Sequence, residues 1–177
     1  MGRFACVLRG INVGGRRKLK MIDLKAQLTQ LGFENIETYI QSGNVVFDSQ
    51  ENDAKKIEEI VTNMISDVFD LEVPVVIRSK KDFLAMLEGN PHEVNENSIK
   101  SLHLIFLKSQ PEQAKFEEIL SMDVEGESLN LVHLDLILKC GEKYSQVKLN
   151  NAFVERKLKV SSTTRNWKTI VKIKDLL

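Results

Sequence analysis

The order of β-rich and helical stretches is the feature that most constrains this chain of 177 residues. Short runs of branched apolar residues alternate with runs whose apolar residues recur every three or four positions, and these patterns indicate strands and helices respectively. From residue 3 to residue 88 the order is strand, helix, strand, strand, helix, strand and a short helix. The stretch from residue 102 to residue 177 repeats this order.

The repeated order predicts an α+β fold, a tandem duplication of ferredoxin-like βαββαβ units with a C-terminal helix. We expect a first half over residues 1–90 and a second half with the terminal helix over residues 99–177, in one compact two-lobed protein. In a ferredoxin-like unit the first and second strands run in the same direction. The loop 10–20 should therefore lie beside the turn 41–44, which follows the second strand.

Individual residues predict where some helices begin. Ser79 and Asp82 are spaced to cap a helix that starts between them. Pro111 suits the first turn of the next helix, because its missing N–H is not needed there. The stretch 149–158 is expected to be a helix with Phe153 facing the core.

Charge is distributed unevenly, although the net charge is zero. Residues 1–20 carry six basic groups and no acidic group, residues 139–177 carry ten basic and three acidic groups, and residues 21–138 carry nine basic and 22 acidic groups. If the termini lie close together, as they often do, they would form a basic face that attracts anions over about 8–10 Å. The alternative is that these charges are ordinary solvated surface.

A glycine-rich basic segment, 8–18, follows the first strand and resembles the strand–loop–helix cradle that binds phosphate. Gly10 and Gly15 have the spacing of a Walker A loop, but Arg16 and Arg17 stand where its Lys and Ser or Thr would be, and the dinucleotide fingerprint is absent. A generic anion site and an ordinary glycine turn with solvated arginines both fit. The candidate ligand-binding residues of this segment are Arg9, Asn12, Gly14, Gly15 and Lys18.

Two further polar segments are candidates for the same site. The turn after the second strand offers Gln41, Ser42 and Asn44, which are also the residues of an ordinary turn. Near the C-terminus, Arg165 and Asn166 stand at a predicted helix start, where they suit a phosphate or carboxylate. The alternative there is a simple helix cap, with Arg165 paired to an acidic residue. Lys148 is a further basic candidate.

The sequence predicts no metal site and no cofactor. The three histidines, His92, His103 and His133, share no ligand spacing, and no CxxC pair occurs. Cys6 and Cys140 lie in apolar, strand-like runs, which is typical of buried thiols in a reducing compartment, so a cytoplasmic location is expected. No apolar run approaches the roughly 18 residues that span a bilayer, and we expect no membrane partner.

Four sequence segments carry a resemblance to a known family. LRGINVGG (8–15), TYIQSGNVVF (38–47), VPVVIRS (73–79) and TTRNW (163–167) resemble the bacterial family called domain of unknown function sixteen-ninety-seven. The resemblance covers essentially the whole chain and implies an α+β duplication of ferredoxin-like units. It implies no catalytic residue, because the biochemistry of the family is not established. The family usually has Ser-Lys-Leu where this chain has Val147, Lys148 and Leu149, so a site that used this serine would be incomplete here.

Three classes of function stay open. The first is a binding protein for a phosphate-bearing ligand, and a small ligand is favoured over nucleic acid because the net charge is zero, aromatic residues make up 6% and the SGNVVF strand lacks stacking rings. The second is an enzyme for a small anionic substrate, with Tyr39, Lys18 or Lys148 moving protons. The third is a structural or interaction module whose polar segments hold the two halves together and bind no ligand.

Overall fold

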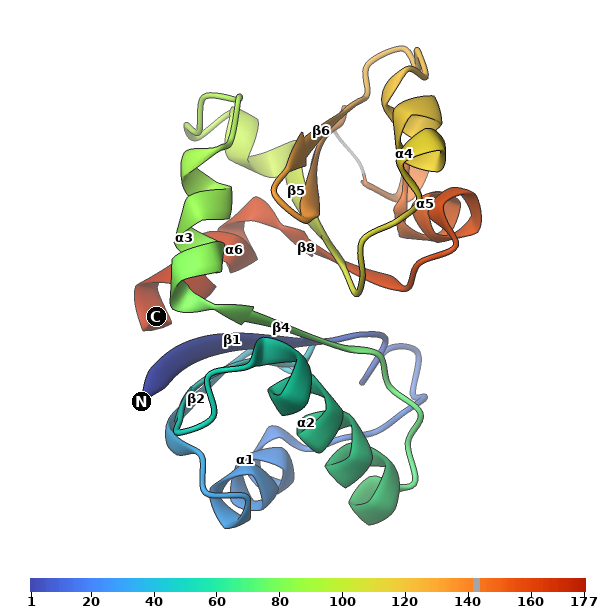
Figure 1. The fold of residues 1–177 in the computed structure, drawn as a ribbon. Helices are drawn as coiled ribbons and strands as arrows, with labels where there is room; N and C mark the ends of the chain where they lie inside the picture. The colour runs from blue at the N-terminus through green and yellow to red at the C-terminus, as the bar shows by residue number, and fades with distance from the viewer. Residues whose placement is uncertain (142–143) are drawn as a thin grey trace. The chain divides into compact units, whose positions relative to one another are not determined.

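The computed structural model describes residues 1–141 and 144–177. The chain divides into two compact units, Met1–Leu84 with Lys172–Leu177 and Ala85–Val171 (Figure 1). In the described part of the chain, each unit contains one four-stranded antiparallel sheet. The expected bounds of the two halves, residues 1–90 and 99–177, stay a prediction.

The first unit has its strands in the order β2-β3-β1-β4. Helices α1 and α2 cover one face of this sheet (Figure 1). Between them and the sheet lies a core that includes Phe4, Leu24, Phe47 and Ile65, each at most 2% exposed. The elements of this unit are β1 (Gly2–Leu8), α1 (Met21–Gln30), β2 (Glu34–Tyr39), β3 (Asn44–Ser49), α2 (Ala54–Phe69) and β4 (Val75–Ser79).

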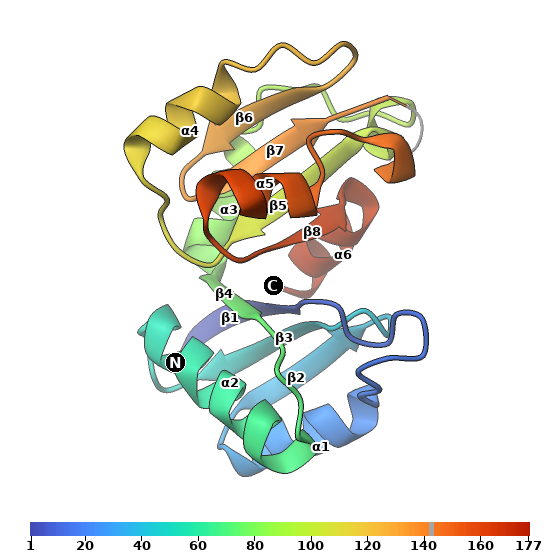
Figure 2. The ribbon, with the colours of Figure 1, turned by 90° about the vertical axis from the view of Figure 1, so that its right-hand side faces the viewer.

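The second unit has the corresponding strand order, β6-β7-β5-β8. Helices α4 and α5 lie over one face of its sheet (Figure 2), and Ile105, Phe116, Leu138 and Val154 belong to the core beneath them. Its strands and helices are β5 (Leu102–Leu107), α4 (Gln113–Leu120), β6 (Ser128–Val132), β7 (Asp135–Lys139), α5 (Asn151–Leu158) and β8 (Ser162–Asn166). Two 3₁₀ turns, η1 (Ser98–Lys100) and η2 (Tyr144–Gln146), complete it.

A helix follows the last strand of each sheet directly, α3 (Lys80–Glu88) after β4 and α6 (Trp167–Leu176) after β8. The predicted cap of α3 is confirmed, because the Ser79 hydroxyl accepts from the Asp82 N–H over 3.1 Å and donates to its carboxylate over 2.6 Å. The chain is therefore a mixed α+β protein in which the same succession of elements occurs twice, in line with a duplicated unit.

Two details of the predicted second half are wrong. Pro111 lies before α4 rather than in its first turn, because Glu112 occupies the N-cap position. Helix α5 begins at Asn151 rather than at residue 149, because the Asn150 side chain accepts from the Phe153 N–H and caps the helix there. Phe153 faces the core as expected: it is partly buried and packs against the core of the second unit, where its neighbour Val154 is fully buried.

The connection from the first strand to the first helix is longer in the first unit than in the second. Residues 9–20 join β1 to α1, whereas the five residues 108–112 join β5 to α4. The second unit thus shows that a short connection is enough to join the first strand to the first helix. The order of strands and helices therefore does not require the additional residues of the connection 9–20.

Candidate anion-binding site

The long connection after β1 forms a small β-hairpin. The Asn12 N–H donates to the Arg17 carbonyl and the Arg16 N–H donates to the Val13 carbonyl, each over 3.1 Å. Gly14 and Gly15 form the tip, with φ angles of +58° and +74°. A two-residue hairpin turn favours positive φ at both central positions, which glycine adopts without strain. Residues 12–20 are called the basic hairpin below.

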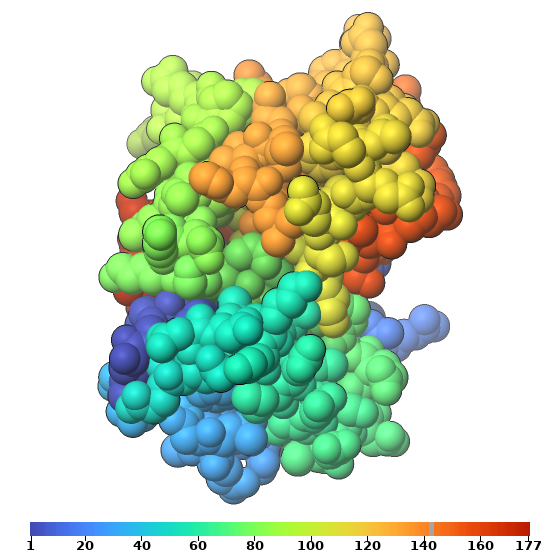
Figure 3. Space-filling view, viewed as in Figure 1, coloured from blue at the N-terminus to red at the C-terminus, as the bar shows by residue number. Residues whose placement is uncertain are grey.

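The base of the basic hairpin is held by the protein interior. Ile11, just before the hairpin, and Leu19, near its end, are 1% and 2% exposed and belong to the core of the first unit. The Asn12 side chain donates to the Leu19 carbonyl over 2.7 Å and accepts from the Leu19 N–H over 2.9 Å. These contacts present the rest of the hairpin outward, and the segment projects from the surface of its unit (blue in Figures 2 and 3).

The basic hairpin lies beside the β2–β3 turn, as the sequence predicts. The Asn12 amide donates to the Gln41 carbonyl over 2.8 Å, and the Leu8 N–H donates to the Gly43 carbonyl over 2.8 Å. The contact leaves no room for a side chain at Gly43, where a Cβ would lie 2.7 Å from the Leu8 Cβ and 2.8 Å from Ile11 Cδ1. The two loops therefore form one fixed edge of the first unit.

Positive charge concentrates in residues 16–20, the second half of the basic hairpin. Arg16, Arg17, Lys18 and Lys20 are exposed. Among the residues that the structure describes, none of these four side chains forms an ion pair. Uncompensated cations at a fixed edge attract anions from solution.

Arg3, in the same unit, shows the opposite arrangement. Its guanidinium contacts the Glu37 carboxylate at 2.9 Å and the Asp48 carboxylate at 3.3 Å, and its side chain is 17% exposed. It also donates to the carbonyls of Asn35 and Leu176. Arg3 therefore links strands of the sheet through its ion pairs, whereas the four cations of the basic hairpin form no ion pair with the described residues.

The other candidates of the first unit take different places. Arg9 is half-buried and its N–H donates to the Pro74 carbonyl over 3.0 Å. Asn44 is 0% exposed, and its amide donates to the Tyr39 carbonyl and the Ser42 hydroxyl, each over 3.0 Å. Asn44 therefore stabilises the turn from within, while Gln41 stands exposed at its surface.

Three candidates belong to the second unit. Arg165 donates to the Thr163 hydroxyl over 2.9 Å and to the Thr164 carbonyl over 3.0 Å. Asn166 accepts from the Thr169 N–H over 2.9 Å, which confirms it as the cap of α6. Lys148 is exposed, and its N–H donates to Glu127 over 2.8 Å. Since Arg9 and Arg165 lie in different units, their membership of one site stays a prediction.

Val147, the position at which the resemblance implies a serine, is part of the second core. It is 5% exposed and packs with the apolar side chains under α5. A serine here would place a hydroxyl among apolar neighbours.

Both cysteines are buried thiols that form no disulfide, as the sequence predicts. Cys140 Sγ lies 3.7 Å from His103 Nδ1, and it donates to the Ser101 carbonyl over 3.2 Å. Burial raises the pKa of the Cys140 thiol, helped by Glu127, and burial lowers the pKa of His103. The pair is therefore a neutral thiol and a neutral imidazole, which is the opposite of an activated nucleophile.

The described residues hold no cluster of three or more His, Cys, Asp or Glu side chains that could bind a metal ion. Likewise, no helix among them is long and apolar enough to cross a lipid bilayer.

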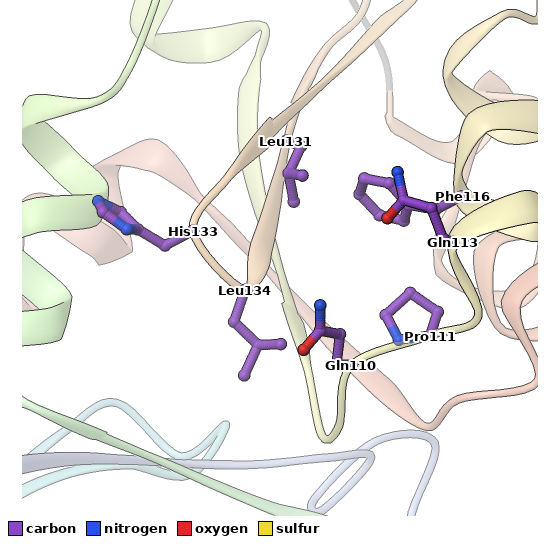
Figure 4. A pocket seen from close by; sticks show the side chains of 7 residues that line it. All are labelled: Gln110, Pro111, Gln113, Phe116, Leu131, His133 and Leu134. Atoms are coloured by element: carbon purple, nitrogen blue, oxygen red, sulfur yellow. The ribbon is translucent and has the colours of Figure 1, made fainter.

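A small cavity lies in the second unit between the start of α4 and the β6–β7 turn. Figure 4 shows Gln110, Pro111 and Phe116 on one side, and Leu131 and Leu134 on the other. Its volume is about 30 Å³, close to the volume that one water molecule occupies in the liquid. An organic ligand needs far more space. This cavity is therefore too small to be the ligand site.

Fold and site together define an α+β protein of two four-stranded units, with an exposed cationic hairpin in the first. A model of the family described as "Protein of unknown function (DUF1697)" matches residues 1–136, and the chain belongs to this family. It is also similar to a solved structure, the conserved bacterial protein SP0830 from Streptococcus pneumoniae. The two are 27% identical with a TM-score of 0.79, and the match covers 99% of this chain and 98% of that one. Among curated proteins, no match is found.

Proposed function

We propose that the chain binds a phosphate-bearing anionic ligand at the basic hairpin of the first unit. The observation that carries the proposal is the group of four exposed cations, Arg16, Arg17, Lys18 and Lys20, that have no ion-pair partner among the described residues. Arginine and lysine both bind phosphate, arginine through its planar fork and lysine as a point charge. The length of the connection supports this role, because the corresponding connection in the second unit does without a hairpin.

Retention on phosphocellulose at increasing salt tests the proposal. The hairpin variant Arg16→Gln/Arg17→Gln/Lys18→Gln removes three cations, and the control variant Lys25→Gln/Lys55→Gln/Lys81→Gln removes three exposed cations elsewhere in the first unit. We expect the hairpin variant to elute at lower salt and the control variant to elute like the wild type. Equal shifts in both variants would show that only net charge matters, and the proposal would then be wrong.

A structural or interaction module is the second candidate, and a specific observation favours it. The amides of Asn12 and Asn44 donate to groups within their own unit, and the carbonyl of Asn166 caps α6. Side chains that complete their hydrogen bonds internally need no ligand. If neither variant changed retention, this second function would be the better account. An enzyme acting on a small anionic substrate stays the third alternative.

We further infer that each unit is a ferredoxin-like fold. The strand orders β2-β3-β1-β4 and β6-β7-β5-β8, all antiparallel, support this assignment, as do the two helices over one face of each sheet. The thiols of Cys6 and Cys140, which form no disulfide, support a reducing, cytoplasmic location.

A further inference from the structure

The shape of the basic hairpin bears on which phosphate-bearing ligand it takes. Arg16 and Lys20 are four residues apart, so an extended chain places them up to about 13 Å from one another. The tip is formed by Gly14 and Gly15, which carry no side chain, and both are exposed. Their added Cβ atoms would meet nothing within 4 Å. Small-ligand sites are concave, whereas a narrow, projecting hairpin does not enclose a small molecule.

The energies also separate a small ligand from a polymer. An exposed ion pair is worth about 0–1 kcal/mol, and a single phosphate on this open hairpin would contact one or two of the four cations. One or two such contacts correspond to a Kd weaker than about 1 mM. A polymer presents a separate phosphate to each cation and releases counterions at every contact, so the same four side chains bind it more tightly.

We propose that the ligand of the basic hairpin is the phosphodiester backbone of a nucleic acid, an inference that rests on the proposed function. Arg16, Arg17, Lys18 and Lys20 each contact a phosphate, and Gly14 and Gly15 let the tip approach the strand closely. The hairpin reads charge rather than sequence. Phe4 and Phe47 of the sheet take no part, because they pack in the core of the first unit, Phe47 with its ring 4.4 Å from that of Phe33. Their burial argues against base stacking on these two rings and leaves backbone contacts unaffected.

Fluorescence anisotropy with a labelled oligonucleotide of about 20 nucleotides tests this inference. With four contacts, log K should fall with log salt at a slope of about −2.8 for a single strand and about −3.6 for a duplex. Binding of a single strand or of a duplex supports the proposal, and the expected slope differs between the two. The hairpin variant should weaken binding by at least about 10-fold and reduce the slope by about 2 for a single strand and about 3 for a duplex, while the control variant should keep both.

Competition separates this inference from the proposed function. Inorganic phosphate and a mononucleotide should displace the oligonucleotide only at phosphate concentrations at least about 100-fold higher than that of the oligonucleotide itself. If they displace it at equal phosphate concentration and bind through the hairpin, the nucleic-acid inference is wrong and the proposed function stands. If no phosphate compound binds, or the hairpin and control variants lose affinity equally, both are wrong.

Discussion

The side-chain amide of Asn12 donates to the main-chain carbonyl of Gln41 over 2.8 Å, so one residue joins the basic hairpin to the β2–β3 turn. The same amide bonds the Leu19 carbonyl at the other end of the hairpin. Asn12 itself has a φ of +55°, a conformation that asparagine tolerates better than most residues. A single asparagine thus sets the position of both loops.

Replacing Asn12 should therefore destabilise the first unit. Asn12→Ala leaves the Leu19 and Gln41 carbonyls without their donors and places alanine at positive φ. We expect the free energy of unfolding in urea to fall by about 1–3 kcal/mol. The control is Asn63→Ala at an exposed position of α2, which should change it by less than about 0.5 kcal/mol. Equal effects would show that Asn12 contributes no more than a surface asparagine.

Gly43 and Gly32 separate backbone strain from steric overlap. Both have positive φ, +79° and +84°, but a Cβ at Gly43 would overlap Leu8 and Ile11, while one at Gly32 would meet nothing within 4 Å. Gly32→Ala should reduce the free energy of unfolding by about 1–2 kcal/mol, the price of the left-handed conformation. Gly43→Ala should lose a further 1–3 kcal/mol or so, because the two loops must move apart.

Thermal unfolding of the two variants measures this difference. A Gly43→Ala protein as stable as Gly32→Ala would mean that the β2–β3 turn moves away from Leu8 without loss. The close contact of the two loops would then contribute nothing to stability.

Much of the fold could be predicted because the pattern of apolar residues is strong. Ile57, Val61, Met64 and Ile65 recur at helical spacing, and all four are buried in α2. The expected neighbourhood of the loop 10–20 and the turn 41–44 also followed from strand directions alone, and the hydrogen bond from Asn12 to Gln41 confirms it.

The hairpin itself was not predicted, because glycines after a strand suggest a phosphate-binding loop as readily as a turn. The signal that could have found it is the Gly14-Gly15 pair, which is typical of a two-residue hairpin turn. Arg16 and Arg17 count toward the expected basic face but not among the candidate ligand-binding residues, although they carry half of the unpaired charge of the hairpin. The greater length of the connection 9–20 relative to 108–112 depends on where the strands and helices end, which the sequence alone does not show.

Arg3 should be sensitive even to a substitution that keeps its charge. Its three guanidinium nitrogens donate to the carbonyls of Asn35 and Leu176 and to the carboxylates of Glu37 and Asp48. A lysine ammonium cannot reach all four groups from one position. We expect Arg3→Lys to lower the free energy of unfolding by about 1–3 kcal/mol, measured by urea denaturation.

The exposed pair of Lys56 and Glu51, 3.7 Å apart, is the control for Arg3. Lys56→Gln should change stability by less than about 1 kcal/mol, because exposed ion pairs contribute little. If Arg3→Lys were as mild as Lys56→Gln, the contacts of Arg3 would be no more than a surface ion pair.

His103 should make stability depend on pH. Burial lowers its pKa in the folded protein below the ordinary value near 6.5, so the unfolded chain binds the proton more readily. The free energy of unfolding should therefore be fully maintained above about pH 6.5 and decrease as the pH falls below it toward the folded pKa. His103→Gln should flatten this dependence between about pH 6.5 and 5.5, measured by urea denaturation, whereas His133→Gln at an exposed turn should preserve it. A wild-type protein equally stable at both pH values would contradict the assignment of a neutral, buried His103.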